Sequence, residues 1–344
     1  MEMDSVMIIM APMRGYTDRV FREVWSRNFS GVDEAVAPFI SLQQAKDLSV
    51  KILGDLAKKE TGSIPVVPQI LGNHPAAFIS LACRLEDMGF RELNWNLGCP
   101  FPMVAKKAKG SGLLCFPDRV DAFLEEVCSH SPLKVSVKIR LGRHSKDETG
   151  ALLAVLNRYP LHRVILHPRI GVQMYEGRPD LKAFHYFLHA SCHPLVYNGD
   201  IWSRDDFQAL SSCFSGVNSW MLGRGLLADP FLPERIKGIF ADKKEDELDR
   251  FILFYKDLEA AYQKKLSGPS HLLARMKGWW VCFNESFEGG DILFKKIRKL
   301  QKLDLFQKEV QAFFDSRPAW LPSRAGGWVD PACCIDHGRV EGCL

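Results

Sequence analysis

Residues 134–141 read Lys-Val-Ser-Val-Lys-Ile-Arg-Leu, a stretch in which apolar and polar side chains alternate. Such alternation is typical of a β-strand, because successive side chains point to opposite faces. The apolar set suits packing against a layer of helices, which leaves Lys138 and Arg140 on the inner face. A cation there is costly unless an anion meets it. The stretch predicts a central strand beside an anion site, with an internal ion pair to a carboxylate as the structural alternative.

Seven further apolar stretches of strand length lie before and after this one, and a segment with helical periodicity follows each of the eight. Strands that alternate with helices are typical of a parallel sheet, and eight such units are typical of a closed (β/α)8, or TIM, barrel. We therefore expect an α/β barrel. The other seven stretches are Val6–Met10, Glu34–Phe39, Val66–Leu71, Glu92–Leu97, Arg163–His167, Leu195–Asn198 and Ser219–Leu222.

Two of the helices have clear boundary signals. Apolar residues within 78–85 recur at i, i+3, i+4 and i+7, and Gly89 supplies a stop. Residues 203–206, Ser-Arg-Asp-Asp, combine a serine N-cap with early acids. An open doubly wound sheet is the alternative architecture. It would need a glycine fingerprint after the first strand, where residues 11–14 read Ala-Pro-Met-Arg.

The pattern changes after Phe240. Residues 248–314 have helical periodicity throughout, with one break at residues 267–269, Ser-Gly-Pro. We predict an all-α helical domain there, and we interpret the end of the chain, which has no helical period, as a tail. The predicted domains are a catalytic barrel over 1–240, a helical domain over 245–318 and a tail over 319–344.

The composition is close to that of an average soluble globular protein. Of 344 residues, 47% are hydrophobic and 25% are charged, and the formal net charge is +4. No apolar run is long enough to cross a membrane, and the start of the chain is not typical of a signal peptide. We expect a cytoplasmic monomer without membrane contact. A nucleic-acid partner would require local positive charge.

The ten cysteines have no metal-ligand spacing through residue 330, so we interpret them as reduced thiols. Cys333, Cys334 and Cys343 lie near His337, which makes zinc binding in the tail conceivable. The adjacent pair and the missing CxxC motif favour a tail without metal. We predict no metal site.

The strand at residues 92–97 ends in a motif with chemical potential. Asn96 is followed by Gly98-Cys99-Pro100, and the proline ends the strand. A lone cysteine is more often inert. Active sites of such barrels lie at the C-terminal ends of the strands, and Lys138 would lie nearby, so this position favours a chemical role for Cys99.

Other strand ends carry polar groups as well. Gln69 and His167 end two strands, and residues 198–200 and 223–225, Asn-Gly-Asp and Gly-Arg-Gly, follow the last two. Glycines at these positions let the backbone approach a phosphate. The residues predict a phosphate-anchored cofactor in the barrel mouth, surrounded by amide, imidazole, ammonium and thiol groups.

Six short motifs in the chain resemble the tRNA-dihydrouridine synthases, and the resemblance covers about residues 7–314. Residues 271–277, His-Leu-Leu-Ala-Arg-Met-Lys, look most like the C subfamily of bacteria. The six motifs are Ala11-Pro12-Met13, Asn96-Leu97-Gly98-Cys99-Pro100, Gly110-Ser111-Gly112-Leu113-Leu114, Val137-Lys138-Ile139-Arg140-Leu141-Gly142, Asn198-Gly199-Asp200-Ile201 and Gly223-Arg224-Gly225.

The resemblance implies an enzyme that binds FMN, takes NADPH as reductant and reduces the C5–C6 double bond of specific uridines in tRNA. Backbone atoms after the first strand would touch the flavin ring, Lys138 would favour the negative charge of reduced flavin, and Arg224 would help to hold the phosphate. The cofactor-binding residues implied are Pro12, Met13, Gln69, Lys138, His167, Asn198, Gly199, Asp200, Gly223 and Arg224.

The resemblance also implies that Cys99 is the catalytic acid. Hydride would pass to C6 of a uridine flipped out of the tRNA, the thiol would protonate C5, and Asn96 would orient the base. Two departures stand out: Pro168 occupies an expected glycine position, and residues 101–103, Phe-Pro-Met, are more apolar than usual. Residues 175–178 match the tyrosine-bearing loop of the family well.

A basic stripe is predicted on the last long helix, where Lys295, Arg298, Lys299 and Lys302 share one side and apolar residues line the other. An ordinary solvated face is the structural alternative. Lysines at 106, 107 and 109 would border the same groove, and phosphate contacts of this kind position RNA without reading its sequence. The implied tRNA contacts are Asn96, Arg140, Tyr175, Arg178, His271, Arg275, Lys277, Lys295, Arg298 and Lys299.

Three other functions stay open at this point. A different FMN barrel oxidoreductase, such as a dihydroorotate dehydrogenase, would act on a small molecule and would not need the helical domain. An RNA-binding protein without catalysis would have no use for a thiol in the mouth. A flavin-free lyase or isomerase would bind phosphate only. Which uridine is modified depends on how the helical domain orients the tRNA.

Overall fold

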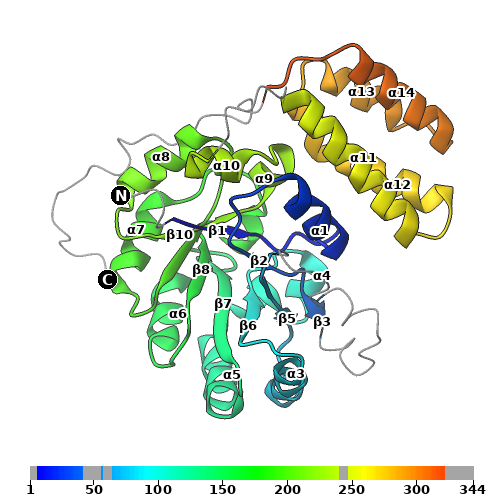
Figure 1. Ribbon diagram of the computed structural model, residues 1–344. Coiled ribbons are helices and arrows are strands. Elements are labelled where there is room, and N and C mark those ends of the chain that lie inside the picture. Colours follow the sequence, from blue (N-terminus) through cyan, green and yellow to red (C-terminus); the bar gives the residue numbers. More distant parts are fainter. Residues whose placement is uncertain (1–5, 42–55, 57–63, 240–246, 322–344) are drawn as a thin grey trace.

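The computed structural model describes residues 6–41, 56, 64–239 and 247–321. Its strands form one sheet in the order β3-β5-β6-β7-β8-β9-β10-β1-β2-β4, and every pair is parallel. The sheet is curled and helices cover its outside (Figure 1). The strands are β1 (Met7–Met10), β2 (Glu34–Val36), β3 (Ile40–Ser41), β4 (Val66–Val67), β5 (Gln69–Leu71), β6 (Glu92–Leu97), β7 (Lys134–Arg140), β8 (Val164–His167), β9 (Leu195–Asn198) and β10 (Ser219–Leu222).

The eight predicted strands are confirmed, but two of them are interrupted. Pro38 separates β2 from β3 and Pro68 separates β4 from β5, because proline has no amide hydrogen for the ladder. The ladder nevertheless runs past Pro68, whose carbonyl accepts from the amide of Asn94 at 2.9 Å. Since β4 pairs with β2 and β5 pairs with β3, the two ends of the strand order come from adjacent parts of the chain.

Helices follow the strands and pack around the curled sheet (Figure 1). The two boundary signals are confirmed: Gly89 is left-handed at φ +85°, and the hydroxyl of Ser203 accepts from the amide of Asp206. The helices of this part are α1 (Arg19–Asn28), α3 (Pro75–Asp87), α4 (Pro102–Ala105), α5 (Pro117–His130), α6 (Glu148–Leu156), α7 (Leu181–Ala190), α8 (Arg204–Cys213), α9 (Arg224–Ala228) and α10 (Leu232–Lys237), with short 3-10 helices η3 (Gly110–Leu113) and η4 (Gly171–Gln173).

The alternation predicted for residues 134–141 separates two cores. Val135, Val137 and Ile139 belong to the large core that also takes in buried side chains of the surrounding helices. A second, smaller core lies on the inner face of the sheet and contains Ile9, Ala11, Val36, Val67, Ile165, Val196 and Met221. The inner face is therefore packed, and only its C-terminal edge is left for a site.

The C-terminal part is helical, with α11 (Glu247–Lys265), α12 (Pro269–Phe283), the 3-10 helix η5 (Asn284–Ser286), α13 (Gly290–Ile297) and α14 (Leu303–Asp315). The predicted break is confirmed at Gly268, which has φ +87°. The prediction of one long helix through Lys302 is wrong, because α13 ends at Ile297 and α14 begins at Leu303. The ammonium of Lys277 donates to the carbonyls of Arg298 and Leu300 and so satisfies backbone groups released by this ending.

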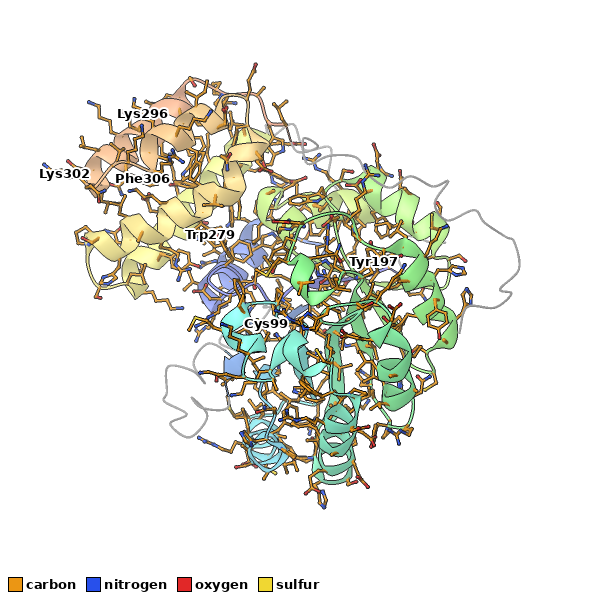
Figure 2. All side chains as sticks on the ribbon, turned by 180° about the vertical axis from the view of Figure 1, so that it is seen from behind. Cys99, Tyr197, Trp279, Lys296, Lys302 and Phe306 are labelled. Carbon is orange, nitrogen blue, oxygen red and sulfur yellow. The ribbon has the colours of Figure 1, made fainter. Side chains whose placement is uncertain are left out.

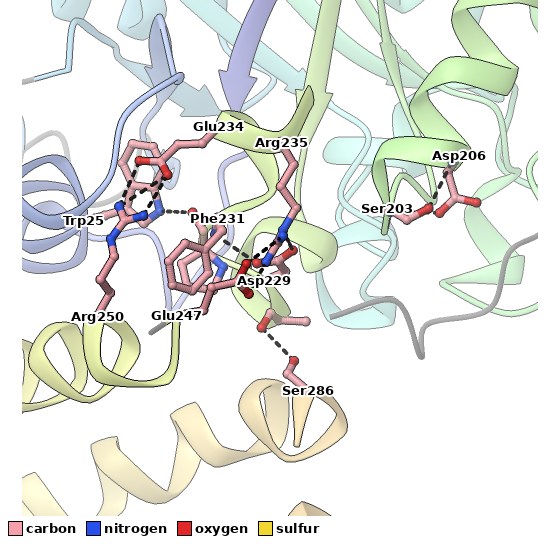
Figure 3. Close-up of polar contacts among 12 residues, drawn as sticks. Trp25, Ser203, Asp206, Asp229, Phe231, Glu234, Arg235, Glu247, Arg250 and Ser286 are labelled. Atoms are coloured by element: carbon pink, nitrogen blue, oxygen red, sulfur yellow. Dashed lines mark hydrogen bonds and ion pairs between the residues drawn. The ribbon is translucent and has the colours of Figure 1, made fainter. Parts of the chain in front are cut away.

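Aromatic packing joins the helical part, residues 247–321, to the strand-and-helix part, which is formed by the described residues up to Ile239. Trp279 of α12 stacks on Phe21 of α1 with ring centroids 4.8 Å apart, and Figure 2 places Trp279 where the two parts meet. The hydroxyl of Ser286 donates to the carbonyl of Ala228 at 2.7 Å (Figure 3). The four residues come from four different helical segments, so the two parts share one buried boundary.

Ion pairs surround this boundary (Figure 3). Arg250 of α11 lies 3.2 Å from Glu234 of α10. Arg235 binds both Glu247, at 2.6 Å, and the buried Asp229, at 3.2 Å. The guanidinium groups thus connect α10 to the start of α11.

Several predictions fall outside the described residues. They concern the linker at 241–246 and the tail beyond Leu321, including the four tail residues Cys333, Cys334, His337 and Cys343. Across the described ranges there is no group of three or more side chains suited to hold a metal ion. No helix in those ranges is both long and apolar enough to cross a membrane.

Candidate active site

A cavity of about 280 Å³ opens at the C-terminal edge of the sheet. Its wall consists of residues at the ends of β6 to β10 and in the loops that follow β1, β2 and these strands. Most of the site residues predicted from the sequence are brought together here. They are Pro12, Met13, Asn96, Cys99, Lys138, Arg140, His167, Tyr175, Asn198, Gly199, Asp200, Gly223 and Arg224.

Asn96 shapes the turn that carries the cysteine. Its side-chain oxygen accepts from the amide of Gly98 at 3.1 Å and from the amide of Cys99 at 2.9 Å. Its amide nitrogen donates to Gln69 at 2.8 Å. Both the oxygen and the nitrogen of the asparagine side chain are therefore hydrogen-bonded, and the side chain fixes the backbone at Gly98 and Cys99.

The carbonyls of the same turn are all bound. Arg140 donates to the carbonyl of Gly98 at 3.1 Å, and Arg143 donates to that of Pro100 at 3.0 Å. The carbonyl of Cys99 accepts from both the amide and the hydroxyl of Ser111, each at 3.0 Å. Residues 98–100, which we call the thiol turn, are thus fixed by side chains from β6, from β7 and the loop after it, and from η3.

Sequence reasoning did not assign Ser111 or Arg143 to the site. The Gly110-Ser111-Gly112 motif was the available signal. Gly110 has φ +55°, and a Cβ there would lie 2.8 Å from the Cβ of Cys99. Glycine is required because η3 approaches the thiol turn so closely.

Cys99 is a free cysteine that is only 8% exposed. Burial raises the pKa of its thiol, while a backbone hydrogen bond at Phe101 and the nearby cations Arg140 and Lys138 oppose the rise. The thiol therefore keeps its proton at neutral pH, while the two cations would stabilise a thiolate once the proton has left. Figure 2 shows Cys99 in the interior, at the strand-and-helix part.

Lys138 and Asn198 form a pair on the cavity wall. The ammonium donates to the side-chain oxygen of Asn198 at 2.6 Å, and the amide of Asn198 donates to the carbonyl of Met221 at 2.9 Å. Burial, followed by repulsion from Arg140, lowers the pKa of Lys138 to about 7. A bound anion would offset both effects.

His167 is a neutral imidazole. Burial and the surrounding cations, Arg140 first, lower its pKa well below the usual value. Its Nε2 lies 3.0 Å from the guanidinium of Arg169. Because a guanidinium only donates, Nε2 accepts and the ring proton lies on Nδ1.

Asp200 lies on the cavity wall, where two arginines bind its carboxylate. Its carboxylate binds Arg169, at 2.5 and 2.9 Å, and Arg224, at 2.7 Å. A carboxylate committed to two guanidinium groups orients them, and it would repel a phosphate rather than hold it. Sequence reasoning did not give a role to Arg169, which is almost fully buried and ties this network to His167.

Gln69 lies beneath the cavity, and its expected contact with a cofactor stays a prediction. It is fully buried and is absent from the cavity wall. It donates to Asn94 and accepts from Asn96, each at 2.8 Å. Its partners lie on β6, so it supports Asn96 from below.

Arginines and aromatic rings alternate around the opening. The guanidinium of Arg224 lies 4.9 Å from the ring centre of Tyr175 and 5.1 Å from that of Trp202. Arg14 lies 5.5 Å from the ring centre of Phe39. Of these, only Arg224 and Tyr175 were predicted; Arg14 and Trp202 each stand one position beyond a quoted motif, and Phe39 lies between β2 and β3.

The predicted contacts of the C-terminal part fall in several places. Arg275 donates to the carbonyl of Gly15, next to the cavity rim, and so brings α12 to the opening. Lys277 is used inside the helical part, and Lys295 pairs with Asp291. The exposed residues Arg178 and His271 lie in the loop after η4 and at the start of α12, while Arg298 and Lys299 follow the end of α13.

A family model and the curated relatives of this chain indicate the same family. A family model described as "Dihydrouridine synthase (Dus)" matches residues 9–289. The chain is 29% identical to "Probable tRNA-dihydrouridine synthase 2" of Bacillus subtilis (strain 168), covering 91% of this chain and 94% of the relative. It is 26% identical to "tRNA-dihydrouridine(16) synthase" of Neisseria meningitidis serogroup A, covering 89% and 94%. A solved structure of a morphinone reductase mutant matches 71% of this chain and 90% of its own at 11% identity, with a TM-score of 0.46.

Proposed function

Because this chain belongs to the dihydrouridine synthase family, we propose that it reduces the C5–C6 double bond of uridine in tRNA with FMN and NADPH. It is a flavin-dependent oxidoreductase. The observation that carries the proposal is the buried thiol of Cys99 at the cavity wall beside Lys138 and Arg140, on a turn whose backbone atoms are fixed by hydrogen bonds. A proton donor beside cations is what this reduction needs from the protein.

The cavity suits an anionic cofactor. Lys138, Arg140 and Arg224 present cations to it, while the carboxylate of Asp200 is neutralised by two guanidinium groups. Bound FMN would supply the hydride chemistry, with NADPH as the reductant and C6 of the uracil ring as the acceptor. We assign Lys138 and Asn198 to the polar edge of the flavin, and Arg224 with Gly199 and Gly223 to its ribityl phosphate. Pro12, Met13 and His167 complete this set, with Asp200 and Gln69 as positioning residues.

Protein side chains then complete the reaction. The Sγ–H bond of Cys99 breaks and the proton passes to C5, so that C6 gains a hydride and C5 gains a proton. Arg140 and Lys138 stabilise the resulting thiolate until solvent returns a proton. Asn96 holds the turn and faces the cavity, where its second amide hydrogen is available to the base.

The residues at the rim of the cavity, Arg14, Phe39, Tyr175, Trp202 and Arg224, favour an RNA substrate. Interleaved arginines and aromatic rings offer phosphate contacts and stacking platforms, and small-molecule sites need neither outside the cavity. The contact of Arg275 with Gly15 places α12 beside this rim. We assign tRNA contact to the cavity-wall residues Arg140 and Tyr175 and to the exposed residues Arg178, His271, Lys295, Arg298 and Lys299. Since tRNA is its substrate, we expect the enzyme to act in the cytoplasm.

The architecture proposed for this function is a closed (β/α)8 barrel over 1–240 followed by a helical tRNA-binding domain over 245–318. Pairing of β4 with β2 and of β5 with β3, on either side of Pro68, supports closure. Helices α11 to α14, joined to the rest along one aromatic boundary, support the second domain.

Uridine 16 is the proposed target. The Neisseria relative is named a tRNA-dihydrouridine(16) synthase, and residues 271–277 resemble the C subfamily of bacteria. Mapping of dihydrouridine in tRNA after reaction would test this position. Dihydrouridine elsewhere would refute it without affecting the reaction class.

The first experiment is an absorption spectrum of the purified protein, followed by NADPH under nitrogen and then tRNA that lacks dihydrouridine. We expect flavin bands that bleach with NADPH and recover with tRNA. Bleaching followed by recovery only with a small enone or pyrimidine would favour a small-molecule oxidoreductase. A protein that binds no FMN would overturn the proposal.

A further inference from the structure

An exposed apolar tip follows the thiol turn. Met103 on α4 is 81% exposed, the highest value among the large apolar side chains of the described residues. Phe101 is 52% exposed and also lines the cavity. Both side chains lie within four residues of Cys99, so the tip stands beside the reacting group.

The tip is held rigidly. The carbonyl of Phe101 accepts from the amides of Val104 and Ala105, at 2.9 and 3.0 Å, which closes α4 into a turn. A Cβ on Gly112 would lie 2.3 Å from the carbonyl oxygen of Ala105, so η3 packs directly against α4. Exposed apolar side chains on a fixed backbone indicate a contact surface rather than a loose loop.

The charges around the tip identify its partner. Lys106 and Lys107 are exposed on the next turn, and neither has an ion-pair partner among the described residues. Asn73 donates to the carbonyls of Lys107 and Ala108 and fixes this turn as well. Apolar groups flanked by open cations, at the edge of a cavity that holds a thiol, fit a polyanion with stackable bases.

We propose that Phe101 and Met103 form a wedge, which we call the α4 wedge, that stacks on the base next to the uridine in the cavity. The inference rests on the proposed function and extends it to the RNA around the target. A base that leaves its stack exposes the face of its neighbour, and an apolar side chain can replace the lost contact. Lys106 and Lys107 would contact the adjacent phosphates.

The test compares Phe101→Ala and Met103→Gln with wild type on tRNA that lacks dihydrouridine. Tyr186→Ala is the matched control, because Tyr186 is 54% exposed and lies on α7, away from the cavity wall. We expect kcat/KM for tRNA to fall about tenfold in Phe101→Ala, the size typical of one lost base–aromatic stack. In Met103→Gln, whose side chain is not part of the cavity wall, FMN content and the rate of flavin reduction by NADPH without RNA should stay at the wild-type values, which also shows that this variant is folded.

A second substrate shows whether stacking is the cause. Two tRNAs carry an abasic residue, one on the 5′ side and one on the 3′ side of the mapped uridine. With one of these two tRNAs, the fall in kcat/KM caused by Phe101→Ala should be less than about threefold. Unchanged kcat/KM in both wedge variants, or an equal penalty on all three RNAs, would overturn the α4 wedge while leaving the proposed function in place. Wild-type enzyme that reduces no uridine at all would overturn the proposed function, and the wedge with it.

Discussion

At the scale of single residues, the chemistry depends on how each side chain is charged. Cys99 keeps its proton because burial raises the pKa of its thiol, and His167 stays neutral because burial and four cations lower its pKa. Lys138 is charged in only part of the molecules at neutral pH, because its pKa is lowered to about 7. With a thiol that holds its proton, a neutral imidazole and a lysine that can be charged, the cavity can bind an anion and supply a proton.

Replacement of the thiol should separate the two half-reactions. In Cys99→Ala we expect FMN binding and NADPH oxidation to persist, because the side chains that fix the thiol turn bind its backbone atoms. Reduction of uridine should fall about 100-fold or more, the usual contribution of a general acid. Rapid-mixing absorbance after tRNA addition would measure this. Flavin reoxidation by tRNA at the wild-type rate would remove Cys99 from the mechanism.

The ammonium of Lys138 should make cofactor affinity depend on pH. It is charged below about pH 7, and an anionic cofactor binds that form better, so affinity should fall as pH rises above 7, by at most about tenfold per pH unit. The neighbouring Arg140, whose pKa is lowered only to about 10, and the neutral His167 do not titrate in this range. FMN fluorescence titrations from pH 6 to 9 would measure the slope. A slope that persists in Lys138→Met would assign it to another group.

At the scale of elements, close backbone approach decides whether the thiol turn is fixed. Helix α4 and the 3-10 helix η3 touch through Ala105 and Gly112, and η3 in turn supplies Ser111 to the carbonyl of Cys99. Two short elements, neither stable alone, thus support each other and the reacting group.

Substitution at this contact should destabilise both elements. In Gly112→Ala the new Cβ would lie 2.3 Å from a backbone oxygen, so we expect a loss of about 1–3 kcal/mol in the free energy of unfolding and a fall in uridine reduction. Gly150→Ala is the control: it lies in α6 with no atom within 4 Å of the added Cβ, and should be neutral or stabilising by up to about 1 kcal/mol. Urea unfolding would compare them. An equal free energy of unfolding for Gly112→Ala and wild type would contradict the prediction, because it would show that α4 can move away from the added Cβ without cost.

At the scale of the whole molecule, the boundary between the strand-and-helix part and α11–α14 buries charge. Asp229 is 2% exposed and accepts from the amide of Phe231 at 3.0 Å. Burial raises its pKa to about 7, although Arg235 opposes the rise while also binding Glu247. The boundary is therefore sensitive to pH.

The sign of that sensitivity follows from proton binding. Between about pH 4 and 7 the folded protein holds a proton on Asp229 that the unfolded chain releases, so this group contributes less stability as pH rises, by at most about 1.4 kcal/mol per pH unit. Above pH 7 its contribution is constant. In Asp229→Asn this dependence should be lost. The free energy of unfolding of the variant should therefore rise relative to that of wild type between pH 5 and 8. Urea midpoints at both pH values would measure it, and parallel pH curves would contradict the assignment.

Much of this protein could be predicted from local patterns. The strand of residues 134–141, the cap at Ser203 and the break at Gly268 all depend on side chains within a few positions of each other. The basic helix through Lys302 could not be predicted correctly, because the helix ends where Lys277, more than 20 residues earlier, meets its carbonyls. Ser111 and Arg143 were missed for the same reason, because their partners lie in distant segments, and Arg169 was missed because its ion pair is with Asp200, 31 residues away.

The sequence by itself determined which faces of the strands are apolar, and it determined that a thiol, amides and cations stand at the strand ends. Periodicity and turn residues suffice for that, because they act locally. The fold raises the pKa of the Cys99 thiol, lowers that of Lys138 to about 7 and turns Gln69 and Asp200 toward other side chains, none of which local patterns specify. The physical reason is that desolvation and charge act on a group from every direction at once, and most of the atoms responsible are remote in the sequence.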